Sequence, residues 1–328
     1  MTEAGVQQPS RDATELRLPD AYVVGHGKSG TTAMYEMLFQ HPQIFTGRKE
    51  PRYFVDEMHE RDMPRPGGTP KTLEEYKEWF RGAGPDQLIV DVSPWYLWSQ
   101  TAAGLIAQVR PDARIIAILR EPASFLSSLH RQWLQLYVES EADFRKAIAR
   151  EDARREGRKI PVNTYWPKAL LYSDHVRYAD QLRRYHAVFP PEQVLVLIYE
   201  DFRTDNEATM HEVLRFLDVD HAVPFVLRET NPSVQVRAKR LHSLFRALSV
   251  ADDPVSGTVK KSIRAATPKR QRHRAIRAIR RRVVFGRPRP ADREFMVELR
   301  HRFKPEVEAV SEYLGRDLVN EWGYDRFE

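Results

Sequence analysis

The sequence contains no cysteine, which excludes disulfide bonds, a thiol nucleophile and cysteine metal ligands. No apolar run approaches the roughly 20 residues that cross a membrane, so we predict no transmembrane segment. The N-terminal stretch to Asp20 is polar and lacks the apolar centre of a secretory signal. Because nothing in this composition demands an oxidising compartment, we expect a cytoplasmic location.

Acidic residues are missing from one long segment. The chain has 328 residues and a net charge of +6, yet residues 260–289 hold no Asp or Glu among many Arg and Lys. Such a block favours anionic partners, among them phosphate or sulfate groups, polyanions, nucleic acid and membrane surfaces. It is open whether this block is a solvated linker, a flap that steers an anionic substrate, or a surface for nucleic acid or membrane. We expect a disordered leader over residues 1–18, one domain over residues 19–328 and a mobile segment over residues 250–290.

Short apolar segments alternate with segments of helical periodicity. The apolar segments do not alternate with polar residues, so as strands they would be buried on both faces. With helices between them, they predict a parallel sheet in a three-layer α/β fold, where ligands bind outside the carboxyl ends of the strands. The predicted strands are 21–25, 87–91, 114–119 and 193–199, and the predicted helices are 31–40, 101–109, 123–137, 172–185, 207–217 and 293–314.

A loop for a phosphate-like anion is predicted between the first strand and the first helix. The start of a helix leaves backbone N–H groups unsatisfied, and the helix dipole adds positive potential there. Three glycines in the loop allow the backbone to approach a ligand closely. These features come from Gly25, Gly27 and Gly30, with one charge from Lys28 and hydroxyl groups from Ser29, Thr31 and Thr32.

A P-loop kinase or NTP hydrolase is the first alternative. That motif places a glycine where this chain has Tyr22, and here a second glycine, Gly30, follows the lysine. Residues 88–91 could still serve as the magnesium-holding strand of such an enzyme. The shortened loop favours a single phosphate-like group over a triphosphate.

A second anion site is predicted at the end of another strand. Arg120 closes the strand 114–119, and Ser128 follows on the next helix. A guanidinium group and a hydroxyl group on one crevice make a receptor for a phosphate monoester. Two such sites at neighbouring strand ends indicate a nucleotide that carries two separate phosphate groups.

On these residues the chain resembles the sulfotransferases that use 3′-phosphoadenosine 5′-phosphosulfate (PAPS). The resemblance runs from about Tyr22 to Gly315 and is greatest to the bacterial branch similar to the glycan (heparan-type) sulfotransferases. It is carried by Gly27-Lys-Ser-Gly-Thr-Thr32, Lys49-Glu-Pro-Arg-Tyr-Phe54, Asp91-Val-Ser-Pro-Trp-Tyr96, Leu119-Arg-Glu-Pro122 through Ser128, Val194-Leu-Val-Leu-Ile-Tyr-Glu-Asp201 and Asn231-Pro-Ser-Val-Gln-Val-Arg237.

The resemblance implies in-line transfer of a sulfuryl group to an acceptor hydroxyl or amine, without a metal, leaving adenosine 3′,5′-bisphosphate (PAP). It makes Glu50 the base and Lys28 the stabiliser of the leaving oxygen. Glu50 is flanked by cations and could instead be an ion-pair partner, and His26 is a rival base. The donor-binding residues that the resemblance implies are Lys28, Ser29, Gly30, Thr31 and Thr32 for the phosphosulfate, Arg120 and Ser128 for the 3′-phosphate, and Arg237 and Lys239 near the adenosine.

The acceptor is less defined by the sequence. Aromatic residues at strand ends suit sugar rings, yet core packing explains them equally well. They are Trp95, Tyr96, Trp98 and Trp166, with His130, Arg131 and Trp133 on the helix after Arg120. We expect a carbohydrate hydroxyl or a hydroxylated secondary metabolite as acceptor and no specific nucleic acid. A polyanion-binding protein that uses the basic block is the non-enzyme alternative.

Overall fold

The computed structural model describes residues 16–58, 69–162, 164, 166–225, 235–236, 285–286 and 292–326. Most of the expected leader and of the basic segment, together with Arg237 and Lys239, lies outside the described residues. Near the first described residue, Arg17 donates hydrogen bonds to the carbonyl oxygens of Gly84, Pro85 and Gln87. None of the described helices is long and apolar enough to cross a membrane.

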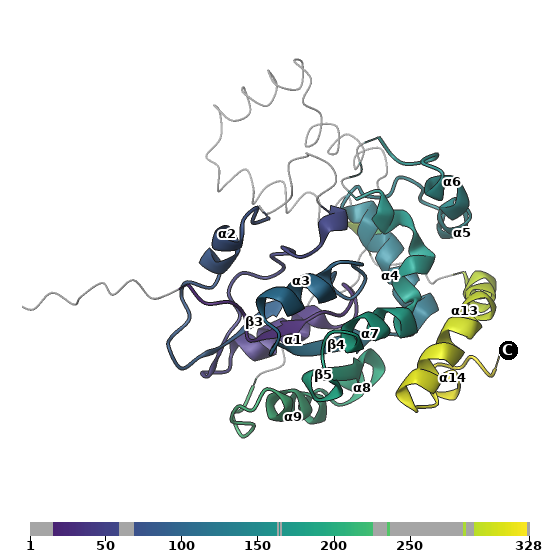
Figure 1. Ribbon diagram of the computed structural model, residues 1–328. Coiled ribbons are helices and arrows are strands. Elements are labelled where there is room, and N and C mark those ends of the chain that lie inside the picture. Colours follow the sequence, from purple (N-terminus) through teal and green to yellow (C-terminus); the bar gives the residue numbers. More distant parts are fainter. Residues whose placement is uncertain are drawn as a thin grey trace, which may run out of the picture.

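A five-stranded parallel sheet forms the centre of the molecule (Figure 1). All of its neighbouring strands pair in parallel, in the order β2-β3-β1-β4-β5. The strands span β1 Ala21–Val23, β2 Ile44–Phe45, β3 Leu88–Val92, β4 Arg114–Leu119 and β5 Val194–Ile198. The four predicted strands are therefore confirmed within two residues, and the short edge strand β2 is an addition.

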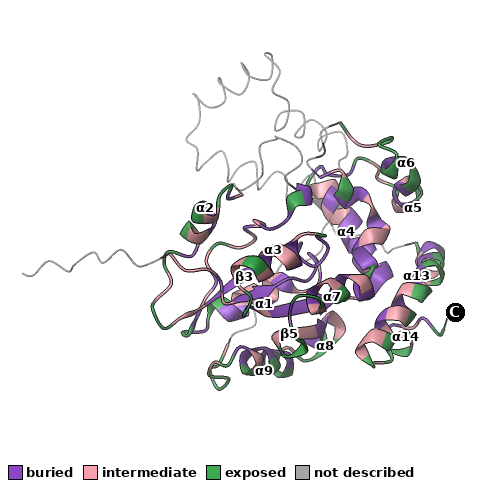
Figure 2. Ribbon diagram, viewed as in Figure 1, coloured by how far each residue is buried: buried purple, intermediate pink, exposed green. Residues whose placement is uncertain are grey.

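Helices cover both faces of the sheet, as its apolar strands require. Along β1, Tyr22 joins one core cluster and its neighbours Ala21 and Val23 join another, because successive side chains point to opposite faces. The first cluster includes side chains from the helices α3 (Ala102–Val109), α4 (Pro122–Gln135), α7 (Tyr178–His186) and α13 (Arg293–Leu314). The second includes side chains from α1 (Thr31–Phe39) and α9 (Asn206–Phe216). In Figure 2 the buried residues lie in the sheet and on the sides of the helices that face it. The three-layer α/β fold is thus confirmed.

The main helices lie where the periodicity predicts them. They are α1 Thr31–Phe39, α3 Ala102–Val109, α4 Pro122–Gln135, α7 Tyr178–His186, α9 Asn206–Phe216 and α13 Arg293–Leu314. Shorter elements, which no periodicity predicted, are α2 Leu73–Glu78, α5 Phe144–Ile148, α6 Glu151–Arg155, α8 Tyr199–Thr204, α14 Leu318–Glu321, the 3₁₀ turns Asp56–Met58, Lys168–Leu170 and Pro191–Gln193, and the antiparallel pair β6 Gln235–Val236 and β7 Phe285–Gly286.

The prediction of one helix over residues 172–185 is wrong. The segment is a 3₁₀ helix over Tyr172–Val176, followed by α7. Arg177 between them has φ −75° and ψ 59°, a conformation outside the helical region that ends one helix and begins the next. Both pieces bury apolar residues, so the hydrophobic pattern continued across the break.

The long helix α13 lies beside α4 and α7 (Figure 1). Its inner face contributes Phe295, Leu299, Phe303, Val307 and Val310 to the same core cluster as the sheet. This packing supports a single domain over residues 19–328, which stays a prediction.

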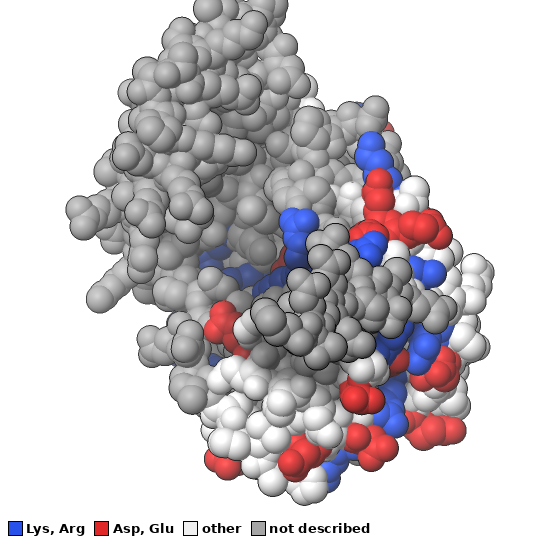
Figure 3. Space-filling view, turned by 90° about the vertical axis from the view of Figure 1, so that its left-hand side faces the viewer, with Lys and Arg blue, Asp and Glu red and all other residues white. Residues whose placement is uncertain are grey.

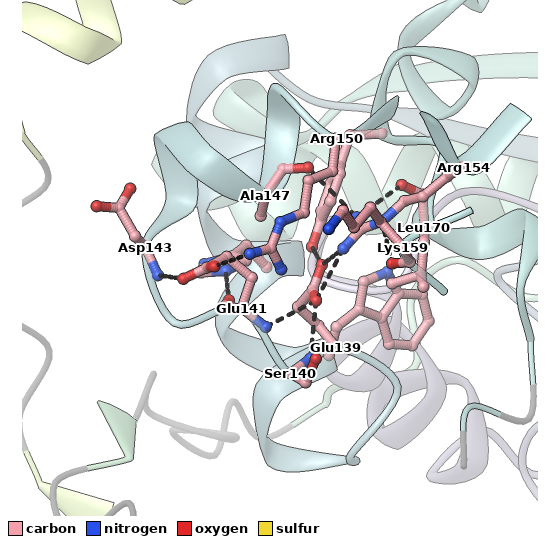
Figure 4. A network of polar contacts seen from close by, with 12 residues as sticks. Glu139, Ser140, Glu141, Asp143, Ala147, Arg150, Arg154, Lys159 and Leu170 are labelled. Atoms are coloured by element: carbon pink, nitrogen blue, oxygen red, sulfur yellow. Dashed lines mark hydrogen bonds and ion pairs between the residues drawn. The ribbon is translucent and has the colours of Figure 1, made fainter. Parts of the chain in front are cut away.

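A buried ion pair fixes the chain that follows α4 (Figure 4). The Arg154 guanidinium donates to both carboxylate oxygens of Glu139, at 2.9 and 2.7 Å, and both side chains are almost wholly buried. The carboxylate also accepts from the backbone N–H groups of Ser140 and Glu141, and Arg154 donates to the carbonyl oxygen of Ala147. Removing one partner of such a pair costs about 3–5 kcal/mol, so this network holds α6 against the end of α4.

Candidate active site

A polar cavity of about 560 Å³ opens at the carboxyl ends of the strands. Its volume lies within the range of small-molecule and cofactor sites. It brings together Lys28, Gly30, Thr31, Thr32, Glu50, Arg120 and Ser128 of the predicted site residues. The remaining lining residues are Gly27, Ala33, Lys49, Gln132, Gln135, Tyr199, Phe202, Arg203 and Asn206.

The loop between β1 and α1 combines positive φ angles with close approach to neighbouring aromatic rings. Gly30 has φ 84°, and a Cβ atom there would lie 2.9 Å from the ring of Phe202. Lys28 also has a positive φ of 80°, which is uncommon for a residue with a side chain. A Cβ atom at Gly27 would lie 2.9 Å from the Trp95 ring, so the loop rests directly on that indole. These constraints point to a loop shaped for a ligand.

The N-terminus of α1 faces this cavity. Thr31, Thr32 and Ala33 line the cavity, and within the described chain no side chain caps the helix and no acidic residue lies in its first turn. The first N–H groups of the helix and the positive end of its dipole are therefore available to an anion. Lys49 comes from a different segment and donates a hydrogen bond to the Thr32 hydroxyl.

Positive charge dominates the cavity wall. Among the described residues that line it, Lys28, Lys49, Arg120 and Arg203 are basic and Glu50 is acidic. Burial lowers the pKa of the Lys28 ammonium below its ordinary value, and the nearby charges of Arg120, Arg131 and Lys49 lower it further. Because an anion would relieve this repulsion, the electrostatics favour binding of a negatively charged group.

Arg120 lines the cavity and is anchored there by the loop after β1 and by α4. Its guanidinium donates to the carbonyl oxygen of Lys28 at 2.5 Å and to the Ser124 hydroxyl at 2.6 Å, and it lies 4.6 Å from the centre of the Tyr199 ring. Its Nε is buried and has no partner among the described groups. Ser128 lines the same cavity from α4, so both residues of the second predicted anion site lie beside the first.

The backbone on either side of Arg120 is also held. The Tyr178 hydroxyl donates to the Arg120 carbonyl oxygen at 2.8 Å. The Glu121 carboxylate caps α4 by accepting from the N–H groups of Ala123 and Ser124, and it accepts the Tyr324 hydroxyl at 2.7 Å. The C-terminal residues of the described chain thus stabilise the strand end that carries Arg120.

Glu50 lies in a strained turn between two cations. Its φ is 59°, and its backbone N–H donates to the Val92 carbonyl oxygen at 3.2 Å. The carboxylate lies 3.6 Å from the Lys49 ammonium and 3.2 Å from the Arg52 guanidinium. Glu50 is therefore an ion-pair partner and also lines the cavity that holds Lys28, so the geometry leaves the hypothesis of a base open.

Ser29 and His26 do not line the cavity. The Ser29 hydroxyl is buried without a partner in the described part of the chain, and its N–H donates to the His26 carbonyl oxygen. His26 is fully buried, and its Nε2 lies 3.0 Å from Oε1 of Gln181. Burial is the main cause that lowers the pKa of His26 to about 3, and the neighbouring His175 lowers it further. A buried, neutral imidazole outside the cavity argues against His26 as the base.

The buried histidines predict acid sensitivity of the fold. Burial also lowers the pKa of His175 to about 4, against an ordinary 6.5 for both residues. Since the unfolded chain takes up these protons first, the stability that the neutral rings provide is complete above pH about 6.5. It is then lost as the pH falls towards 4, at about 1.4 kcal/mol per pH unit for each histidine. Burial raises the pKa of Asp91 to about 6, so protonation of this one carboxylate stabilises the fold as the pH falls below 6 and offsets the loss from one histidine.

Denaturant unfolding across this pH window measures the effect. We expect the free energy of unfolding to fall with acidification. Because Asp91 offsets one of the two histidines below pH about 6, the slope between pH 6 and 4 should fall to near zero in His175→Phe. Phenylalanine keeps the stacking of ring 175 on Trp98, which has a centroid separation of 5.0 Å. An equal slope in the variant and the wild type would contradict this assignment.

The aromatic residues considered for acceptor binding belong to the core. Trp95, Tyr96, Trp98, Trp133 and Trp166 are at most 5% exposed. None of them lines the cavity around Lys28, and neither do His130 and Arg131, so of the two interpretations left open the structure favours core packing. His130 is buried with its Nε2 at 2.8 Å from the Glu141 carbonyl oxygen, and Arg131 donates to the Ser127 hydroxyl. Core packing was the correct interpretation of the aromatic group.

Several cavity residues were missed by reasoning from the sequence. Gln132 and Gln135 follow Ser128 on the same face of α4, at the spacing of successive helical turns, so helical periodicity could have found them. The Gln132 Oε1 atom is buried and has no partner in the described structure. Tyr199 stands in the stretch 194–201 that carries the resemblance, although no role was predicted for it. No motif marked Phe202, Arg203 and Asn206, which come from α8 and the start of α9.

A second cavity, of about 760 Å³, lies between the 3₁₀ turn Asp56–Met58 and α7. Its acidic and basic side chains largely pair with one another, as in Arg155–Asp174 at 2.8 Å and Arg177–Asp180 at 2.7 Å. Figure 3 shows the same mixture of signs over the described surface on one side of the molecule. The cavity around Lys28 is different because its basic residues outnumber its acidic ones.

Asp91 argues against the kinase alternative. It is fully buried and accepts hydrogen bonds from the hydroxyls of Tyr76, Ser93 and Tyr96. It does not line the cavity, so the strand 88–91 presents no carboxylate to a magnesium ion there.

Comparisons with known proteins agree with this geometry. Residues 18–240 match the family described as the sulfotransferase domain. The chain is 29% identical over 217 residues to the human bifunctional heparan sulfate N-deacetylase/N-sulfotransferase 3, covering 64% of this chain and 23% of that protein. It is 27% identical over 213 residues to the mouse heparan sulfate glucosamine 3-O-sulfotransferase 6, covering 63% and 54%. The match thus spans about a quarter of the length of the first relative and about half of the length of the second.

A solved structure shows the same fold. The sulfotransferase from Alicyclobacillus acidocaldarius superposes with a TM-score of 0.64 at 23% identity, covering 93% of this chain and 99% of that one.

Proposed function

The chain belongs to the sulfotransferase domain family, and from this premise we propose that it transfers a sulfuryl group from PAPS to a carbohydrate hydroxyl or amine. The observation that carries the proposal is the single cavity that joins Lys28, Arg120, Ser128 and Glu50. Two anion-binding regions in one cavity fit a nucleotide with phosphate groups on both sides of its ribose. PAPS supplies an activated sulfuryl group on its 5′-phosphate.

The loop and α1 hold the phosphosulfate end of the donor in this proposal. The N–H groups at the start of α1 and the hydroxyls of Thr31 and Thr32 bind its oxygens. The Lys28 ammonium stabilises the negative charge that develops on the leaving oxygen. The Ser29 hydroxyl is buried away from the cavity, so we assign that residue to shaping the loop.

Arg120 and Ser128 bind the 3′-phosphate in this proposal. The Arg120 guanidinium lines the cavity and has N–H groups beyond its two bonds to Lys28 and Ser124, and together with the Ser128 hydroxyl it supplies donors on one side of the cavity. The bonds from Arg120 to the Lys28 carbonyl oxygen and to Ser124 fix the guanidinium before a ligand arrives, which reduces the entropy lost on binding. Arg237 and Lys239 remain proposed contributors near the adenosine.

Glu50 takes the proton of the acceptor. Its carboxylate faces the cavity together with Lys28, and the adjacent Lys49 and Arg52 keep it oriented. General base catalysis needs such a carboxylate within reach of the acceptor proton. The in-line transfer otherwise depends on charge stabilisation, which the cationic wall provides, so the proposal includes no metal.

The names of the two curated relatives support a carbohydrate acceptor, since both are heparan sulfate sulfotransferases, one acting on nitrogen and the other on oxygen. We therefore propose glucosamine-containing glycans as the first acceptors to assay.

Binding of PAP without magnesium tests the donor assignment. At about 100 times its Kd, PAP should stabilise the fold by about 2.7 kcal/mol and raise the melting temperature by roughly 5 °C in EDTA. Adenosine 5′-monophosphate, which lacks the 3′-phosphate, should shift it less. In Arg120→Gln the two nucleotides should become nearly equivalent, because the group that distinguishes them has lost its cation. Stabilisation by magnesium ATP and not by PAP would contradict the donor assignment and favour an NTP-binding protein.

A further inference from the structure

The turn that carries Glu50 needs support from outside itself. Both Glu50 and Arg52 have positive φ angles, 59° and 55°, although neither is a glycine. Each such residue costs of order 1–3 kcal/mol unless the surrounding structure imposes the conformation. The position of the Glu50 carboxylate therefore depends on whatever holds residues 50–53.

Two hydroxyl groups hold this turn by its backbone. The N–H of Arg52 donates to the Ser93 hydroxyl at 3.2 Å, and the N–H of Tyr53 donates to the Tyr96 hydroxyl at 3.1 Å. The N–H of Glu50 itself donates to the Val92 carbonyl oxygen. All three acceptors belong to the end of β3 or to the segment just after it.

Both hydroxyls are oriented by one buried carboxylate. Ser93 donates to Oδ1 of Asp91 at 2.7 Å, and Tyr96 donates to Oδ2 of Asp91 at 2.9 Å. An ionised carboxylate only accepts, so each hydroxyl directs its single proton to Asp91 and its lone pairs to the backbone N–H. Asp91 is fully buried and does not line the cavity, so it has no direct contact with a substrate there.

We propose that Asp91 is a positioning residue that, through the hydroxyls of Ser93 and Tyr96, holds the turn 50–53 so that Glu50 faces the cavity. This role rests on the proposed function, in which Glu50 is the base. Asparagine at position 91 has the same shape but carries a donor on one side. The hydroxyl on that side would accept from the amide and could no longer be oriented by donating its proton to position 91.

The chain offers a matched control. The Tyr76 hydroxyl also donates to Oδ2 of Asp91, at 2.7 Å, and Tyr76 is as buried as Tyr96. The bond from Tyr76 does not continue to the turn, whereas the bond from Tyr96 does. Tyr96→Phe and Tyr76→Phe therefore remove equivalent bonds from Asp91 and differ in whether the turn loses an acceptor.

Transfer kinetics and hydrogen exchange together test the proposal. We use labelled PAPS with N-sulfated heparosan and with its N-unsubstituted form as acceptors, and PAP for binding. Ser93→Ala and Tyr96→Phe should lower kcat by about 10- to 100-fold with PAP affinity unchanged, whereas Tyr76→Phe should keep kcat near the wild-type value. The amide of Arg52 should exchange faster in Ser93→Ala and that of Tyr53 faster in Tyr96→Phe, and neither should change in Tyr76→Phe.

Two results would overturn the positioning role. One is wild-type exchange of these amides in Ser93→Ala and Tyr96→Phe, and the other is an equal loss of kcat in Tyr76→Phe. Hydrogen exchange needs no sulfuryl acceptor, so it decides whether the two hydroxyls hold the turn even without transfer activity. A wild-type chain that transfers no label would count against the proposed function alone.

Discussion

Lys28→Met is expected to lower the rate of sulfuryl transfer by about 10²–10³-fold, the usual cost of removing one preorganised group that stabilises developing charge. The ammonium lies in a wall shared with Lys49, Arg120 and the N-terminus of α1, and it is the basic group carried by the loop itself. Methionine keeps the length of the side chain and is no worse than lysine at a φ of 80°. Stability should rise slightly or stay unchanged, because the variant removes a like charge from this crowded wall. The measurement is the initial rate with labelled PAPS, together with the melting temperature.

Lys146→Met serves as the matched control for this variant. Lys146 is an exposed lysine on α5 that does not line the cavity, so the same substitution there should leave the rate unchanged. A Lys28→Met enzyme that retains more than about half of the wild-type rate would remove the leaving-group role of this residue.

Glu50→Gln should lower kcat by about 10²–10⁴-fold and leave PAP affinity close to that of the wild type. Glutamine preserves the shape of the turn and most of its contacts, but it accepts no proton from the acceptor. Because the variant also leaves Lys49 and Arg52 without their carboxylate, donor binding should be equal or slightly tighter. Single-turnover transfer measures the chemical step, and calorimetry with PAP measures binding.

The exposed Glu74 on α2 provides the comparison, since Glu74→Gln removes a carboxylate that does not line the cavity. If Glu50→Gln transferred label as fast as Glu74→Gln, the carboxylate would be only an ion-pair partner. If it instead lost PAP affinity with kcat retained, its role would be in donor binding.

Local sequence patterns predicted the fold well where burial repeats along a single element. The strand β4 and the helix α13 have the predicted bounds, because one is apolar throughout and the other keeps a helical period over its whole length. The loop after β1 was predictable because its glycines, lysine and threonines are adjacent in sequence. Arg120 and Ser128 were placed correctly on one cavity because the carboxyl ends of parallel strands meet at the same edge.

Contacts between distant segments could not be predicted in this way. The donation from Lys49 to Thr32 and the bond from Tyr324 to Glu121 join residues that only the folded chain brings together. The positive φ of Glu50 has no sequence signal either, since the bonds that hold its turn come from Ser93 and Tyr96, in the segment after β3. The strand-end aromatics were ambiguous because the same rings suit a sugar or a core, and only their burial decides between these.

Transfer of labelled sulfuryl groups from PAPS to glucosamine-containing glycans, in EDTA and with Lys28→Met alongside the wild type, tests the central claim most directly. The account predicts labelled glycan and free PAP from the wild-type chain and at least about 10²-fold less from the variant. Equal labelling by both proteins, or no labelling of any glycan by a wild-type chain that fails to bind PAP, would contradict it.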